Sequence, residues 1–345
     1  MTTPRRRPVR RVVPALLLAS TLTLASCSGG EPKASGPTRT KSPTPTPTTP
    51  SPTPTPPPHL PFTGKPVPKG VPHRPGLVVK IDNTSSARPQ LGLGSADMVV
   101  EELVEGGATR LAMFLQSRLP RVAGPVRSQR TSDIGVVKPT RGALVASGAA
   151  PRVRHAMRRA KIRTVVEPTA GMFRSSVRHA PYNLMVHPSR VAHTVHRRPV
   201  PPDYFAWAKL AAPALPHAST ARQATVRFSA FHSTRWRHRA SGWVRTNGLA
   251  ARGHEFHADN LLVLRVRTRD AGYRDPAGNP VPETVTTGTG PATLLDGTHV
   301  VPLRWHKRSR HDRFRFTRRT GGEVRMPPGH TWVELVPLRG SVALH

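Results

Sequence analysis

The chain of 345 residues contains one cysteine, Cys27, and its position restricts what the rest can fold into. A cluster of arginines comes first, followed by an apolar run from Val12 to about Leu24, in the order typical of an export signal. The run is too short for a comfortable membrane span, which needs about 20 apolar residues. We therefore expect a lipoprotein signal peptide over 1–26, cleavage before Cys27, and acylation of that thiol with a fatty acid such as palmitate.

Two alternatives for this segment remain open: an ordinary secretory peptide cut near Ala25, and an uncleaved signal anchor. In the lipoprotein interpretation the chain is extracytoplasmic and a lipid anchors it to the cell membrane. No thiol follows Cys27, so the exported part can form neither a disulfide nor a cysteine-ligated metal site. Its fold must therefore depend on side-chain packing.

The chain carries 53 lysines and arginines against 18 acidic residues, a formal net charge of +35. Such an excess attracts polyanions through the release of counterions. Nucleic-acid recognition motifs are missing and an exported protein meets little nucleic acid, so we expect no such partner. An anionic cell-wall polymer or a saccharide is the expected partner besides the membrane. Whether the charge is functional or only compositional stays open.

Residues 27–60 are dominated by proline, threonine and serine. Such a segment cannot bury a core, and its prolines favour an extended polyproline conformation. At about 3.1 Å per residue, roughly 33 residues reach on the order of 100 Å. We expect a disordered tether that holds the folded part away from the bilayer.

A first folded domain is expected over 61–190, because runs with strand and helix character are mixed there. Gly106-Gly107 interrupts an apolar stretch and separates two strands. The predicted elements are a strand at 77–81, two strands within 98–116, a helix start at 131–133, a strand at 143–146 and a helix over about 151–160. This mixture indicates an α/β domain.

Residues 191–220 contain many prolines and little periodicity, so they are expected to form a linker or a segment that covers the core. A β-rich domain is expected over 221–345, where apolar runs alternate with turn signals. Its clearest strands are at 225–229, 261–266 and 331–336. The predicted fold class is α+β, with a mixed α/β N-terminal domain followed by a β-rich C-terminal domain.

Short motifs in both halves resemble one bacterial family. They are PFTG at 61–64, KIDN at 80–83, ARPQ at 87–90, GPVRS at 124–128, WHK at 305–307 and PGHTWVE at 328–334. On these motifs, residues 60 to 340 resemble the YerB-like lipoproteins, a family of unknown function with a two-part domain. The resemblance implies an envelope lipoprotein and no particular reaction. Tyr182 departs from the family, where His is usual, which weakens any catalytic role for that position.

Acidic residues are scarce, and six of the 18 lie close together in sequence. If 98–103 is a strand, Glu101 and Glu102 point to opposite faces, and each buried carboxylate needs a cation or a hydrogen bond. The expected partners are Arg88, Arg110, Arg127 and Arg130. The candidate ligand-binding residues are Asp82, Asp97, Glu101, Glu102, Arg110, Arg127, Ser128 and Arg130. The alternative is an internal ion-pair network or a charged hairpin edge.

The segment 124–133 suggests a second use of these arginines. Arginines and hydroxyls before a helix start can hold an anion, helped by backbone N–H groups. In the alternative interpretation Thr131 or Ser132 caps the helix, Asp133 complements its dipole, and Arg127 pairs with a glutamate.

Other motifs are weak. The histidines of 254–257 have the wrong spacing for a zinc protease helix, so no metal and no cofactor are expected. Four tryptophans could line a carbohydrate platform, although burial in strands is commoner; they are Trp236, Trp243, Trp305 and Trp332. We expect a ligand-binding or interaction module in or near the cell wall. The alternatives are a carboxylate-dependent wall hydrolase using Glu101 or Glu102 with Asp97, and a scaffold held by charge, so enzymatic activity stays open.

Overall fold

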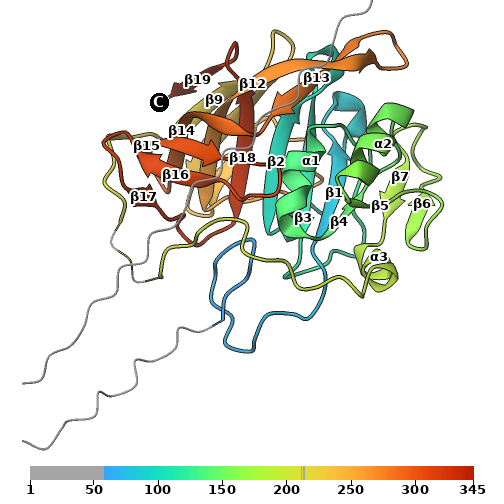
Figure 1. The fold of residues 1–345 in the computed structure, drawn as a ribbon, viewed down its shortest axis with the longest axis horizontal. Coiled ribbons are helices and arrows are strands. Elements are labelled where there is room, and N and C mark those ends of the chain that lie inside the picture. The colour runs from blue at the N-terminus through green and yellow to red at the C-terminus, as the bar shows by residue number, and fades with distance from the viewer. Residues whose placement is uncertain (1–57, 211, 213) are drawn as a thin grey trace, which may run out of the picture. The chain divides into compact units, whose positions relative to one another are not determined.

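A computed structural model describes residues 58–345 except 211 and 213. Cys27, the signal peptide and the tether up to residue 57 lie outside the described residues. One sheet dominates the described part, and its strands run in the order β17-β16-β15-β14-β12-β18-β2-β3-β1-β4-β5, with β13 paired to β12 and β8 to β15 (Figure 1). Both halves of the sequence therefore contribute to the same 13-stranded sheet.

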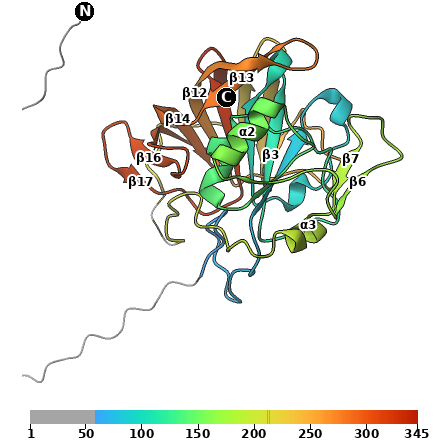
Figure 2. The ribbon, with the colours of Figure 1, turned by 45° about the vertical axis from the view of Figure 1, so that its right-hand side comes forward.

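The N-terminal half supplies short elements around three central strands. The strands are β1 (Leu77–Asp82), β2 (Met98–Leu103), β3 (Thr109–Leu115), β4 (Ala143–Val145), β5 (Arg163–Val165), β6 (Met172–Arg174) and β7 (Leu184–Val186). The helices are α1 (Asp133–Val137), α2 (Pro151–Arg159) and α3 (Pro188–Thr194), with 3-10 turns at Ser85–Ala87, Leu93–Ser95, Glu105–Gly107 and Lys138–Thr140. Figure 2 shows α2 lying across one face of the sheet, where Val153 and Met157 are buried.

The C-terminal half is made of strands. They are β8 (Ser219–Thr220), β9 (Gln223–Arg227), β10 (Ser233–Arg239), β11 (Gly242–Arg245), β12 (Asn260–Arg274), β13 (Pro280–Val285), β14 (Gly288–Asp296), β15 (His299–Lys307), β16 (Arg315–Arg318), β17 (Glu323–Val324), β18 (Thr331–Pro337) and β19 (Ser341–Leu344). Four of them form a separate small sheet in the order β11-β10-β9-β19. Residues of this small sheet pack against one face of the large one, because Trp236 and Trp243 belong to the same core as Val99 and Leu103.

Strand β18 joins the two halves. It lies between β12 and β2 and runs parallel to both, with Trp332 beside Val99 and Glu334 beside Glu101. Every residue of β2 and of β18 is buried, which is typical of central strands covered on both faces. Val99 and Leu103 point into the core under the small sheet. Met98 and Val100 point into a second core, on the side of α1 and α2.

The predicted strands and helices of both halves are confirmed, but the balance between them differs. The fold is predominantly β, with one large mixed sheet, and the α/β character expected of 61–190 is only partly present. The physical reason is length: α1 has five residues, α3 has seven and α2 has nine. Within residues 58–345, leaving out 211 and 213, no helix is both long and apolar enough to cross a membrane.

Part of the segment expected as a linker or cover packs into the core. Tyr204 and Phe205 are fully buried, and their rings stand edge to face at 5.0 Å. Tyr204 also contacts the ring of Phe114 at 5.1 Å, and its hydroxyl donates to the carbonyl of Val136. An aromatic cluster of this kind contributes burial and ring contacts together. Residues 204–207 thus pack against the core and cover it on the side of α1.

This arrangement predicts a large cost for removing one ring. Phe205→Ala should lower the free energy of unfolding by about 3–5 kcal/mol, because a cavity replaces a buried ring. Urea denaturation would measure it. Phe231→Ala is the matched control: its side chain is 86% exposed, so the change should stay within about 0.5 kcal/mol. Equal effects of the two changes would contradict the proposed role of the aromatic cluster.

Candidate functional site

Glu101 and Glu102 lie side by side near the end of β2 and are 0% and 1% exposed. Successive residues of a strand point to opposite faces, as predicted, so each carboxylate enters a different core. A buried carboxylate is costly unless a charge or hydrogen bonds compensate it. The two residues therefore organise two separate polar clusters.

Glu102 belongs to a buried triad with Lys80 and Asp133. The Nζ of Lys80 lies 2.7 Å from Oε1 of Glu102 and 2.9 Å from Oδ1 of Asp133. One ammonium group cannot neutralise two carboxylates, so an extra proton is favoured. Burial, with Asp133 adding to it, raises the pKa of Glu102 to about 7. Burial opposes the charge of Lys80, but its two acidic neighbours raise the pKa above the ordinary value.

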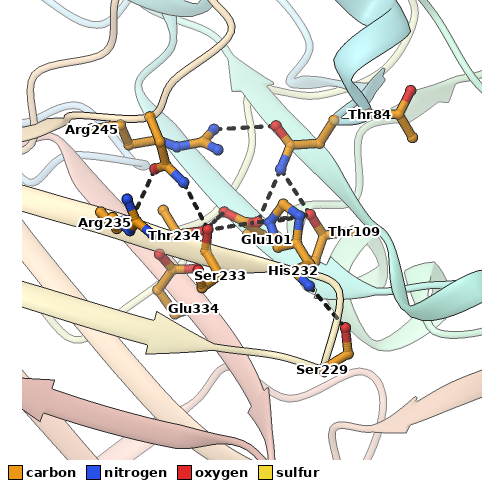
Figure 3. A network of polar contacts seen from close by, with 12 residues as sticks. Thr84, Glu101, Thr109, Ser229, His232, Ser233, Thr234, Arg235, Arg245 and Glu334 are labelled. Carbon is orange, nitrogen blue, oxygen red and sulfur yellow. Dashed lines mark hydrogen bonds and ion pairs between the residues drawn. The ribbon is translucent and has the colours of Figure 1, made fainter.

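Glu101 is held by many more partners (Figure 3). Its Oε1 lies 2.9 Å from Nε2 of His232. It also accepts hydrogen bonds from the side chains of Asn83, Thr109 and Thr234. Burial alone would raise the pKa of Glu101, but the charge of Arg245 and the contacts with His232 lower it to about 2. This carboxylate is therefore ionised at every physiological pH.

A second carboxylate, Glu334, lies next to Glu101 on the neighbouring strand β18. Its Oε1 accepts a hydrogen bond of 2.8 Å from Nε1 of Trp236. Burial, followed by the charge of Glu101, raises the pKa of Glu334 well above its ordinary value. Burial and the neighbouring charge thus favour the protonated form of Glu334 beside the ionised Glu101.

Above Glu101, a pocket of about 440 Å³ opens between the two halves of the chain. Its lining includes Asn83, Thr84, Ser85, Phe231, His232, Arg245 and Asn247. Nη1 of Arg245 donates to Oδ1 of Asn83 at 3.2 Å, and the guanidinium lies 5.0 Å from the ring centre of Trp332. We call this space the Glu101 pocket. Its wall is polar, and His232 connects it to the buried carboxylate.

The structure does bring the predicted arginines together, but they already form ion pairs with carboxylates of the protein. Arg110 and Arg130 both bind the carboxylate of Glu105, and Arg127 lies 2.6 Å from Asp82. Arg110 also donates to the backbone carbonyl of Ser128 at 2.8 Å. Burial and the positive charges of its neighbours lower the pKa of Arg110 to about 10. This face is the internal ion-pair network of the alternative interpretation.

Several predicted contacts are wrong. The partners of Glu102 and Glu101 are Lys80 and His232, and the expected arginines pair with other acids or, for Arg88, with none in the described part. Asp97 lies at the opposite end of β2 and accepts from the backbone N–H groups of Gln116 and Ser117. No pair of carboxylates among Asp97, Glu101 and Glu102 faces a common cleft.

The anion site suggested before α1 stays a prediction, and the side chains there make contacts within the protein. Asp133 is buried there, and its Oδ2 accepts the backbone N–H of Arg130 at 2.6 Å. Ser132 does not cap α1; its hydroxyl accepts the N–H of Thr284 at 2.9 Å. The Asp133 carboxylate thus takes one of the backbone N–H donors that an anion there would use. The carbohydrate platform is wrong as well, because all four tryptophans are buried.

Sequence reasoning missed four residues of the two clusters: Lys80, His232, Arg245 and Glu334. Lys80 offered a signal, since a lysine inside an apolar strand needs an acidic partner. Glu334 offered the same signal within the apolar run 331–336. His232 and Arg245 offered none, because they lie among many other histidines and arginines.

The fold and clusters define a class: a two-part β-rich protein whose halves share one sheet, with a carboxylate-centred cluster on each face. The model of the family described as "Protein of unknown function (DUF3048) N-terminal domain" matches residues 62–201, and its C-terminal counterpart matches 224–333. The chain belongs to this DUF3048 family, which confirms the resemblance to the YerB-like proteins.

Two comparisons with YerB from Bacillus subtilis, one of sequence and one of structure, accord with this family. The chain is 44% identical over 70 residues to the "Putative lipoprotein YerB" of strain 168, an alignment that spans 20% of this chain and 21% of that protein. The crystal structure of the YerB protein superposes with a TM-score of 0.69 at 19% identity. This superposition covers 83% of this chain and 99% of the crystallised chain. At this identity the second comparison shows the fold alone.

The raised pKa of Glu102 predicts a pH dependence of stability. Folded Glu102 titrates near 7 and an ordinary glutamate near 4.5, so the folded state binds more protons between these values. Its contribution is fully present below pH 4.5 and is lost as the pH rises through 7. Glu102→Gln should therefore flatten the fall in the free energy of unfolding between pH 5.5 and 8, measured by urea denaturation.

Glu105→Gln is the control for this titration. The arginines beside Glu105 outweigh its burial and lower its pKa to about 2, so it is ionised throughout that pH window. Its loss should reduce stability by the same amount at pH 5.5 and 8. If Glu102→Gln behaved in the same way, the buried triad would not hold the extra proton.

Proposed function

We propose that this chain is an exported, lipid-anchored binding protein of the cell envelope whose ligand enters the Glu101 pocket. One observation carries the proposal: His232 and Arg245 from the C-terminal half and Asn83 from the N-terminal half converge on Glu101 and line the same pocket. A structural ion pair needs no open pocket beside it. The polar lining instead offers donors and acceptors to a small polar molecule.

The ligand should be a cell-wall fragment with hydroxyl groups and a carboxylate. The guanidinium of Arg245 can form a bidentate pair with a carboxylate. In the described residues, its Nε is buried without an acceptor, so the protein leaves part of this guanidinium's hydrogen-bonding capacity unused. The amides of Asn83 and Asn247 provide further hydrogen-bonding groups for a saccharide.

Glu101 serves this pocket by fixing His232. The ionised carboxylate lies 2.9 Å from Nε2 of His232, so it holds the imidazole in one orientation. The same carboxylate accepts hydrogen bonds from three other side chains, and it faces away from Glu102. This arrangement gives no support to the hydrolase alternative, because Asp97, Glu101 and Glu102 do not present two carboxyl groups to one substrate.

The binding proposal predicts the effect of one substitution. Arg245→Gln should weaken the binding of soluble peptidoglycan fragments at least tenfold, because the bidentate pair is lost. Isothermal titration calorimetry on the full-length protein measures this. Arg237→Gln is the matched control, since Arg237 is exposed on β10 outside the pocket and should leave binding unchanged. Unchanged binding by a folded Arg245→Gln variant would refute the assignment of the pocket.

The anchoring proposal rests on Cys27 and on the lipoprotein name of the Bacillus relative. The native protein should incorporate a palmitate analogue and sediment with membranes, and Cys27→Ser should abolish the labelling. Gel fluorescence of labelled cells and fractionation would measure both. Labelling that survives the substitution would exclude this site. A protein released unlabelled into the medium would favour cleavage near Ala25.

A further inference from the structure

A larger cavity, of about 1130 Å³, lies apart from the Glu101 pocket and shares none of its lining residues. Segments far apart in sequence build it: 137–142, 161–162, 198–203 and 306–315. Its lining contains eight lysines and arginines and two histidines, against Asp203 and Asp312. We call it the basic cavity.

The two aspartates do not neutralise these cations. Asp203 lies 3.0 Å from Nε2 of His59, and Asp312 accepts the backbone N–H of Ser309 at 3.1 Å. Among the described residues, Arg308 is the one lysine or arginine of the basic cavity with a carboxylate within 4.0 Å, at 3.7 Å. This differs from the arginine face around Glu105, where ion pairs are complete. The cavity therefore gathers positive charge that the protein itself leaves uncompensated.

Lys307 makes the imbalance clearest. It is 2% exposed, its Nζ donates to the backbone carbonyl of Asp312, and the ammonium lies 5.0 Å from the ring centre of Phe314. An ammonium has three N–H donors, and no carboxylate is within ion-pair distance in the described part. Burial lowers the pKa of Lys307 to about 7. A bound anion would restore the charged form.

We propose that the basic cavity binds a stretch of an anionic polymer that carries several phosphate groups. Guanidinium groups can hold phosphate oxygens in bidentate geometry, and several segments of the chain bring arginines to this cavity. The volume exceeds what one inorganic anion fills, so several linked phosphates are the better fit. A concave site also suits a chain better than it suits the flat surface of a bilayer. The site is independent of the Glu101 pocket.

The test uses tripolyphosphate as the probe. Isothermal titration calorimetry on the full-length protein at about 0.15 M salt should show saturable binding, which weakens as salt is raised. The double variant Arg198→Gln/Arg315→Gln should bind at least tenfold more weakly. Neither side chain forms a hydrogen bond or ion pair in the described part, so the variant should fold, as circular dichroism would verify.

The matched control removes the same charge elsewhere. Arg237→Gln/Arg239→Gln changes two exposed residues of β10 outside the cavity and should leave affinity within about twofold. Equal weakening in both double variants would show that net charge alone attracts the probe, and it would overturn the proposal. Absence of binding by the native protein would overturn it as well.

A second arm identifies the source of the phosphates. A purified soluble wall polymer of phosphodiester units should displace tripolyphosphate from the native protein. Vesicles containing about 30% phosphatidylglycerol should not displace it. Displacement by the vesicles and not by the polymer would overturn the choice of a polymer and assign the cavity to lipid headgroups.

Discussion

Two consecutive glutamates near the end of a fully buried strand set the strongest constraint on this structure. Because Glu101 and Glu102 point to opposite faces, each core must supply its own compensation, and the two solutions differ. On one face, Glu102 shares a single lysine with Asp133, and this favours one extra proton on the triad. On the other, the charge of Arg245, together with an imidazole, two hydroxyls and an amide, keeps the carboxylate ionised. Such buried groups are costly to keep and are better attested as determinants of specificity than of stability.

The basic residues of the folded part have two different surroundings. Around Glu105 and Asp82, arginines complete an internal network and leave little for a ligand. In the basic cavity, cations from distant segments face one another with few acidic partners. A composition of 53 basic residues cannot distinguish these cases, because what matters is which carboxylates the fold places beside each guanidinium.

Local patterns predicted local structure well. The apolar run at 77–81 and the alternation on either side of Gly106-Gly107 depend on neighbours in sequence, and both gave the observed strands. The opposite orientation of Glu101 and Glu102 followed from the same period of two. The parallel pairing of β18 with β2 could not be predicted, since it joins residues more than 230 positions apart. His232 and Arg245 reach Glu101 only through that long-range packing, so the site escaped sequence reasoning. Sequence reasoning also missed the burial of Tyr204, Phe205 and Trp207, because their proline-rich surroundings indicated a linker. These three aromatic side chains complete the core.

The position of β18 has a consequence for the order in which the molecule can form. A ribosome completes β2 and β3 long before it reaches residue 331, and until then β2 lacks its parallel neighbour. The pairing of β18 with β2 and β12 therefore forms last. These contacts join residues that are distant along the chain, and such contacts are slow to form. The contacts of β2 and β12 with β18 can therefore form only after the last segment of the chain has been made. That delay accords with the export proposed above, because a chain that lacks its native form can pass through a translocation channel.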